Sequence, residues 1–440
     1  MLGVILRAAA LGAVVLAASV PAPVWAQSAS ESAFQELLKD PGNPDKNIIY
    51  AKALIDEGDI EGAVAVFERL VLLYPDRAEL HLTLGQLYQR IGSDAAAAQA
   101  FDAAIAAPTT TPQIKAQAES ARGQALARTA TSRFSGSIFA GVQYQTNANA
   151  GPSSHRISSD GNRIDRPNDS DPNDDVSGVA GFNLNHTYDF GRQDGMALES
   201  RLYGYGQVYG QNTELDTGRL GGQVGLGFAP FAGDGGFFRL QPRVNFEGAL
   251  TDGEWLEGGG GPGIGGRFTL SDTLAVDLDY DAIYRNYDHV DSLGSTEDYT
   301  GWEQTFGPTL NWLITPGTTF IAGLKGRFSD TKKDFLDFGG LEASVALYQV
   351  YNSPVDFLPR DWLVGGSVTY ETRWYDAPDD SIDDDVSRHD NLYQFDLVNT
   401  IPITESWSWN QQFQYLLDDS NLRNYSYDNF TVATSARWRF

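Results

Sequence analysis

The stretch Asn429–Phe440, NFTVATSARWRF, alternates apolar and polar residues over its whole length. One face of an extended chain here would carry Phe430, Val432, Thr434, Ala436, Trp438 and Phe440, and the other would carry Asn429, Thr431, Ser435, Arg437 and Arg439. A period of two is typical of a β-strand with one apolar face. We therefore expect the sequence to end on a strand, where a frayed polar tail is more usual.

The same alternation fills the chain from about residue 134 onward, as in GMALESRLYGYGQVYG (195–210) and WLVGGSVTYETRWY (362–375). Many segments hold it for about ten to fifteen residues, the length of a tilted strand that crosses a bilayer. The pattern predicts fourteen strands, at 134–145, 176–190, 196–210, 219–229, 237–250, 262–271, 273–287, 299–313, 318–329, 339–352, 361–375, 390–402, 406–418 and 426–440.

The connections between these strands alternate in length. GRQDG, SD and TPG are short, whereas 146–175, 288–298 and 376–388 are long and polar. Short turns on one side and long loops on the other are typical of an outer-membrane barrel. Because an open edge in lipid leaves backbone groups unpaired, we expect the last strand to pair with the first and close the barrel.

Composition excludes several classes. The net charge of −27 argues against nonspecific nucleic-acid binding, and the lack of cysteine excludes disulfides and Cys-ligated zinc. Residues 1–26 combine Arg7, an apolar run and Val24-Trp25-Ala26, which is typical of a secretory signal peptide cleaved after Ala26. No later run is apolar for 18 residues, so we expect no transmembrane helix.

Between residues 27 and 130 the sequence is rich in Ala and Leu and contains a repeat. Gly58, Ala63 and Phe67 recur 34 residues later as Gly92, Ala97 and Phe101. With Leu84-Gly85 and Tyr88, this spacing over residues 44–108 is that of a tetratricopeptide repeat, and 113–128 reads as a capping helix. The sequence thus predicts a short periplasmic helical array (27–130) followed by a fourteen-stranded antiparallel outer-membrane β-barrel (131–440).

Candidate functional residues fall into three sets. The repeat register places groove candidates on the inner helices at Lys52, Asp56, Gln86, Gln89 and Arg90. Charged side chains in the middle of strands are costly in lipid, so we expect the lumen to contain Glu199, Arg201, Arg243, Glu247, Arg327, Glu371, Arg373 and Arg437. The terminal aromatics Trp438 and Phe440 resemble the signal by which outer-membrane proteins are recognised for barrel assembly.

No pattern indicates an enzyme, a cofactor or a metal site. None of the five histidines has a nucleophile motif beside it. Gly258, Gly260 and Gly263 in GGGGPGIGG match a dinucleotide spacing, but no βαβ unit surrounds them, and loop flexibility or a small-residue strand explains them better. The acidic stretches 165–175 and 376–385 lack a calcium-loop pattern and are expected to be solvated loops.

The chain resembles the surface lipoprotein assembly modulator family, often called Slam. The resemblance rests on the order of signal peptide, repeats and barrel, and on GSIFAGVQYQTNANAGP (Gly136–Pro152), where Asn147 and Asn149 lie in an Asn-rich turn after the first strand. It implies a barrel of fourteen strands that delivers lipoproteins or secreted proteins to the cell surface. The expected partners are outer-membrane lipid, the barrel-assembly machinery, and a periplasmic protein cargo or chaperone.

Two other functions remain open from the sequence. The barrel could export an exopolysaccharide, with the repeats docking a synthase, or it could be a passive pore that the repeats merely scaffold. In each case we expect the bacterial outer membrane as the location, with the repeats in the periplasm.

Overall fold

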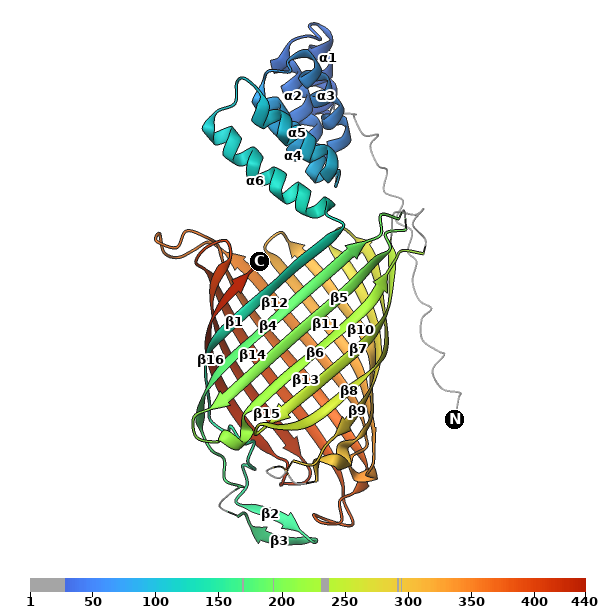
Figure 1. Cartoon of the computed structure of the whole chain (residues 1–440), viewed down its shortest axis with the longest axis vertical. Coiled ribbons are helices and arrows are strands. Elements are labelled where there is room, and N and C mark those ends of the chain that lie inside the picture. Colours follow the sequence, from blue (N-terminus) through green and yellow to red (C-terminus); the bar gives the residue numbers. More distant parts are fainter. Residues whose placement is uncertain (1–27, 168–169, 193, 231–236, 291–292, 294) are drawn as a thin grey trace, which may run out of the picture. The chain divides into compact units, whose positions relative to one another are not determined.

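A computed structural model describes residues 28–167, 170–192, 194–230, 237–290, 293 and 295–440 (Figure 1). The chain divides into two compact units, Met1–Thr129 and Ala130–Phe440. The predicted signal peptide, residues 1–26, lies outside the described residues.

The first unit is helical. Its helices are α1 (Ala29–Leu38), α2 (Pro44–Asp56), α3 (Ile60–Leu73), α4 (Ala78–Arg90), α5 (Asp94–Ala106) and α6 (Pro112–Thr129). Local chemistry sets their ends: the Asn43 side chain caps α2 by accepting from the N–H groups of Asp45 and Lys46, and Pro44 opens the helix. Gly58 and Gly92 follow α2 and α4 with φ of 89° and 73°, a backbone region that favours glycine.

The 34-residue repeat is confirmed in the packing of these helices. Ala63 and Ala97 are fully buried, and Phe67 and Phe101 fill the two apolar cores. Gly85 is required because a Cβ there would collide with the Phe101 ring. Among the described residues, no helix is both long enough and apolar enough to span a membrane.

The second unit is a closed antiparallel barrel of fourteen strands, as predicted (Figure 1). The strands are β1 (Ser132–Gln145), β4 (Asp175–Asp189), β5 (Ala197–Tyr209), β6 (Thr217–Gly227), β7 (Phe238–Thr251), β8 (Glu254–Ser271), β9 (Leu274–Tyr287), β10 (Gly301–Thr315), β11 (Thr318–Thr331), β12 (Phe338–Tyr351), β13 (Trp362–Pro378), β14 (Ser387–Pro402), β15 (Trp407–Ser420) and β16 (Tyr427–Arg439). Each strand pairs with its neighbour in sequence, and β16 pairs with β1 from Ser137↔Arg439 to Gln145↔Thr431.

The outward face of the barrel wall is apolar and aromatic. Phe430 and Trp438 on β16, and Phe440 directly after it, are 40%, 36% and 50% exposed, whereas Thr431 on the other face of β16 is 6% exposed. Strands with lipid-facing apolar residues and polar lumenal ones are those of a membrane-spanning barrel.

Two details differ from the expectation. The strand predicted at 262–271 begins at Glu254, because Asp252 and Gly253 form a two-residue hairpin turn with φ of 52° and 75°. The glycine-rich run, for which the sequence allowed a flexible loop or a small-residue strand, lies entirely within β8. The long connection after β1 also contains an unpredicted hairpin, β2 (Arg156–Ser159) paired with β3 (Asn162–Asp165).

Candidate functional site: the charged barrel lumen

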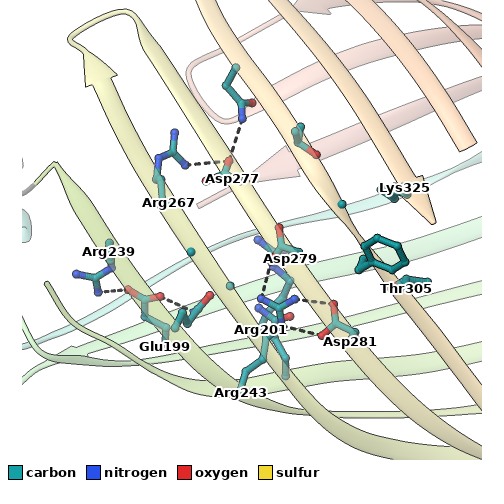
Figure 2. Close-up of a pocket in the computed structure, with 18 of the residues that line it drawn as sticks. Glu199, Arg201, Arg239, Arg243, Arg267, Asp277, Asp279, Asp281, Thr305 and Lys325 are labelled. Carbon is teal, nitrogen blue, oxygen red and sulfur yellow. Dashed lines mark hydrogen bonds and ion pairs between the residues drawn. The ribbon is translucent and has the colours of Figure 1, made fainter. Parts of the chain in front are cut away.

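The barrel encloses a lumenal cavity of about 900 Å³. Six cationic and six acidic side chains line it: Arg201, Arg239, Arg243, Arg267, Lys325 and Arg327, with Glu199, Asp277, Asp279, Asp281, Glu303 and Glu342. Figure 2 shows Arg239 beside Glu199, Arg267 beside Asp277, and Arg243 beside Asp281. The wall of this cavity therefore has polar side chains of both signs in equal number.

Lumenal charges are neutralised across β8, whose inner face is made of Gly259, Gly261, Gly263 and Gly265. Gly263 pairs with Arg243 on β7 and with Asp281 on β9, so all three lie in one row. The Arg243 guanidinium reaches over this glycine to donate to Asp281 at 2.9 Å and 2.5 Å and to Asp279 at 2.8 Å (Figure 2). A Cβ at Gly263 would collide with the Asp281 carboxylate, so glycine makes room for the ion pair.

A continuous ion-pair belt runs around the lumen in the half nearer the long loops. We define it as Arg219, Glu247, Glu257, Arg285, Glu303, Arg327, Glu371 and Arg373. Arg285 pairs with both Glu247 and Glu303, and Arg327 donates to Glu303 at 3.0 Å and to Glu371 at 2.7 Å. Since the belt joins strands from β6 to β13, it fixes the lumenal wall over half of the barrel.

Aromatic rings gather beyond the belt, in an outer aromatic pocket of about 170 Å³. Its rings belong to Tyr287, Tyr299, Trp302, Phe338 and Tyr375. The Arg388 guanidinium lies 4.7 Å from the centre of the Tyr375 ring and 3.4 Å from that of Tyr425. In the loop before β16, burial raises the pKa of Tyr425 to about 12, so this phenol stays neutral at physiological pH.

The structure places the predicted lumen residues in different surroundings. Glu199, Arg201, Arg243 and Arg327 line the cavity, and Glu247, Glu371 and Arg373 belong to the belt. Arg437 lies apart from both, on β16, with its guanidinium 5.9 Å from the centre of the Phe139 ring.

Sequence reasoning missed the partners of these residues, chief among them Arg219, Arg239, Glu257, Arg267, Asp277, Asp279, Asp281, Arg285, Glu303 and Glu342. On β9 the signal was present, since Asp277, Asp279 and Asp281 alternate with apolar residues as lumenal side chains do. Glu257 was missed for a different reason, because it lay in the segment taken for a loop.

The helical unit contains a second polar surface, a groove of about 460 Å³ between α4 and α6. It is lined by Gln86, Ala116, Gln117, Ser120, Ala121 and Gln124. Of the groove candidates, Gln86 lines it, and Gln89 donates to the Ala121 carbonyl oxygen at 3.2 Å. Lys52 and Asp56 are exposed on α2, and Arg90 is exposed at the end of α4.

Within the described residues, no group of three or more His, Cys, Asp or Glu side chains could hold a metal ion. His81 contacts the Pro75 carbonyl oxygen at 2.8 Å, and His186 contacts the Ser132 hydroxyl at 2.9 Å and stacks on Phe134. These histidines have structural partners.

Comparisons with known proteins give a family match for part of the helical unit. Residues 54–119 match the family model for the tetratricopeptide repeat, and a comparison with curated proteins gives no match. A solution structure of a tetratricopeptide repeat domain protein from Salinibacter ruber is similar, with 26% identity, a TM-score of 0.19, and coverage of 20% of this chain and 89% of that one.

Two membrane structures are similar in the barrel. An outer membrane channel from Pseudomonas putida F1 has 16% identity and a TM-score of 0.34, covering 69% of this chain and 96% of that one. A bacterial polysaccharide outer membrane secretin has 10% identity and a TM-score of 0.35, covering 69% and 98%. The family match thus lies within the helical unit, which carries a tetratricopeptide repeat and precedes the membrane-spanning barrel.

Proposed function

We propose that this protein is an outer-membrane channel that delivers lipoproteins or secreted proteins to the cell surface. The observation that carries the proposal is the direct join between a repeat unit and a barrel with a polar lumen. Helix α6 ends at Thr129 and strand β1 begins at Ser132, so two residues link them. Strand β1 begins at the short-connection end of the barrel, so the chain passes from the repeats into the barrel at that end.

The charges of the lumen favour a polypeptide substrate. A pore that selects one sign of ion carries an excess of the opposite charge along its wall. Here six cations face six acids in the cavity, and most of them are paired with one another. A wall without net charge suits a chain that carries side chains of both signs.

The remaining sequence features fit export and assembly in the outer membrane. Residues 1–26 would act as the signal peptide, leaving 27–130 in the periplasm and 131–440 in the membrane. Trp438 and Phe440, whose rings lie 4.9 Å apart on the lipid-facing side, would be read by the barrel-assembly machinery. The resemblance to the Slam family, carried by Asn147 and Asn149, supports the choice of cargo.

The groove between α4 and α6 would hold the cargo or its chaperone. Its side chains from Gln86, Gln117 and Gln124 carry amides, which can donate to and accept from a peptide backbone. Lys52, Asp56 and Arg90 would contribute charged contacts at the exposed ends of α2 and α4.

The test is protease shaving of intact cells that express this protein with a lipoprotein or secreted protein encoded beside its gene. We expect surface exposure of that cargo to depend on this protein and to fall when residues 31–128 are deleted. The double variant Gln86→Glu and Gln124→Glu should lower exposure, because carboxylates in the groove can no longer donate hydrogen bonds. The matched control, Gln35→Glu on α1, changes the same chemistry outside the groove. Unchanged exposure without the protein would refute the proposal for that cargo.

Polysaccharide export is a second candidate, because the outer aromatic pocket favours it. Rings such as Tyr287, Tyr299 and Tyr375 offer faces on which sugar rings can stack. An exporter would lose secreted polymer when Tyr299 and Tyr375 are replaced by Ala, whereas a protein translocator would lose surface cargo when the repeats are removed.

A further inference from the structure

The lumenal cations divide sharply into paired and unpaired groups. Nine have a carboxylate partner within 4.0 Å: Arg219, Arg239, Arg243, Arg267, Arg285, Lys325, Arg327, Arg373 and Arg388. All nine lie between β6 and β14. Within the described part of the chain, Arg201, Arg437 and Arg439 have no such partner, and these lie on β5 and β16. Arg133, on β1, donates to the Ala130 carbonyl oxygen at 3.5 Å.

The wall around Arg437 and Arg439 contains no acid. We call it the seam wall, because it includes the junction of the first and last strands; it comprises residues 132–139, 181–188, 407–412 and 433–440. No Asp or Glu occurs in these four ranges, in a chain with 58 acidic residues. Its lumenal side chains are instead hydroxyls and amides, such as Ser137, Asn183 and Asn410. Arg437 and Arg439 thus have no carboxylate partner at the short-connection end of the lumen.

The geometry of β16 aims both guanidiniums inward. Trp438 and Phe440 occupy the lipid-facing positions, so Arg437 and Arg439 alternate to the lumenal side. In the pairing with β1, Arg437 lies opposite Phe139 and Arg439 lies opposite Ser137. Both arginine side chains are exposed within the lumen and can reach a ligand.

From this arrangement we propose that Arg437 and Arg439 form an entry site for an acidic segment of the translocated polypeptide. The inference rests on the proposed function in taking the substrate to be a polypeptide. Each guanidinium can bind one carboxylate through two parallel hydrogen bonds. Residues two apart on a strand are about 6.6 Å apart, which is also the spacing of alternate side chains on an extended peptide. The pair therefore matches acidic residues at i and i+2, which a single phosphate or lipid headgroup would not span.

Arg201 extends the same surface toward the cavity. Its Nε donates to Asn185 Oδ1 at 3.2 Å, and Asn185 lies opposite Ser135 on β1. Since Arg201 also lines the cavity, an acidic segment released from β16 finds the next uncompensated guanidinium there. Beyond Arg201 the lumenal cations are paired with carboxylates, so they do not hold the acidic segment deeper in the channel.

The experiment measures binding of a labelled twelve-residue peptide of alternating Asp and Ser to the full-length protein in detergent, by fluorescence anisotropy at low salt. We expect the double variant Arg437→Gln and Arg439→Gln to bind it about tenfold or more weakly, because charge-assisted hydrogen bonds are lost. Arg437→Lys with Arg439→Lys should recover part of the affinity through charge alone. A heat-dependent shift of the folded band in gel electrophoresis checks that each variant forms the barrel.

Two control variants make the result decisive. The double variant Arg156→Gln with Asp165→Asn removes an exposed ion pair of the β2–β3 hairpin and leaves the net charge unchanged. Lys332→Gln with Lys333→Gln removes two cations from the loop after β11, and neither double variant should change the affinity. Equal binding of the Asp–Ser peptide to folded wild type and folded Arg437→Gln/Arg439→Gln would overturn the proposal. So would displacement of the peptide by inorganic phosphate, or by anionic phospholipid vesicles, at equal charge concentration. Cargo exposure on cells is a separate readout, so failure of the proposed function is distinguishable from failure of this site.

Discussion

Arg285 is the junction of the ion-pair belt, and Arg285→Met tests whether the belt stabilises the barrel. Arg285 pairs with Glu247 and Glu303 and lies 3.7 Å from Glu257, whose side chain is only 3% exposed. Breaking a fully buried pair costs about 3–5 kcal/mol. The Arg285 and Glu303 side chains are each 21% exposed to lumenal water, which screens the interaction and lowers our expectation to about 2 kcal/mol.

The control for this change is Arg360→Met. Arg360 pairs with Glu405 at 3.4 Å, but their side chains are 46% and 87% exposed, so the expected loss is under about 1 kcal/mol. Both variants can be unfolded in a guanidinium series in detergent micelles, with the folded fraction read from the heat-modifiable band in gel electrophoresis. Equal losses for the two variants, or no loss for Arg285→Met, would refute the view that the belt stabilises the barrel. The double variant Arg285→Met with Glu247→Gln should lose less free energy of unfolding than the two single variants together, because Arg285 and Glu247 interact directly.

Three further predictions follow from the packing and the charges. Gly85→Val forces a side chain into the Phe101 ring and should cost the helical unit about 1–3 kcal/mol, seen as an earlier loss of helical circular dichroism in urea. The Ser30 hydroxyl and backbone amide donate to the Glu57 carboxylate and lower its pKa in the folded protein. These hydrogen bonds therefore stabilise the helical unit above about pH 4.3, the ordinary pKa of a Glu side chain, and the stabilisation is lost as the pH falls through the lowered pKa of Glu57. In Ser30→Ala the pH at which pepsin begins to cut α1 should therefore rise, and an unchanged onset would contradict the link. Arg243→Gln leaves five cations facing six acids in the cavity. The interaction energy between a permeating ion and the uncompensated charge, about 7 Å away in water, is about 0.6 kcal/mol, so the pore should prefer cations about threefold. The reversal potential in a KCl gradient measures this selectivity.

Much of the architecture could be predicted from the sequence, because its signals are periodic. The 34-residue spacing from Gly58 to Gly92 fixes the helical repeat, since only glycine suits the left-handed turn that ends each inner helix. Period-two alternation gave the number of strands, because every strand must turn one face to lipid and one to water.

The start of β8 could not be predicted in this way. Its lumenal positions carry glycines from Gly259 to Gly265, so the alternation of side chains that marks a strand is missing. The reason for these glycines is visible only in the structure, where Arg243 and Asp281 meet above them. The Asp252-Gly253 turn was the one local signal that a hairpin lay there.

The pairing of the lumenal charges was equally out of reach. Charged residues in the middle of strands pointed to the lumen, but each partner comes from a strand whose register the sequence does not specify. Arg327 and Glu371, for example, are separated by 44 residues and by the whole of β12. The sequence does not show that Arg437 lacks a carboxylate partner, because this depends on which cations the strand registers bring next to acids.

The measurement that tests the central claim most directly is photocrosslinking from inside the barrel during export. p-Benzoylphenylalanine placed at Thr305, which lines the lumenal cavity, should crosslink to the neighbouring cargo protein in living cells. The same group at Leu324, an exposed lipid-facing position on β11, should not. A cargo adduct at Thr305 alone is the predicted result. Cargo that reaches the cell surface without any adduct at Thr305 would contradict passage through this lumen.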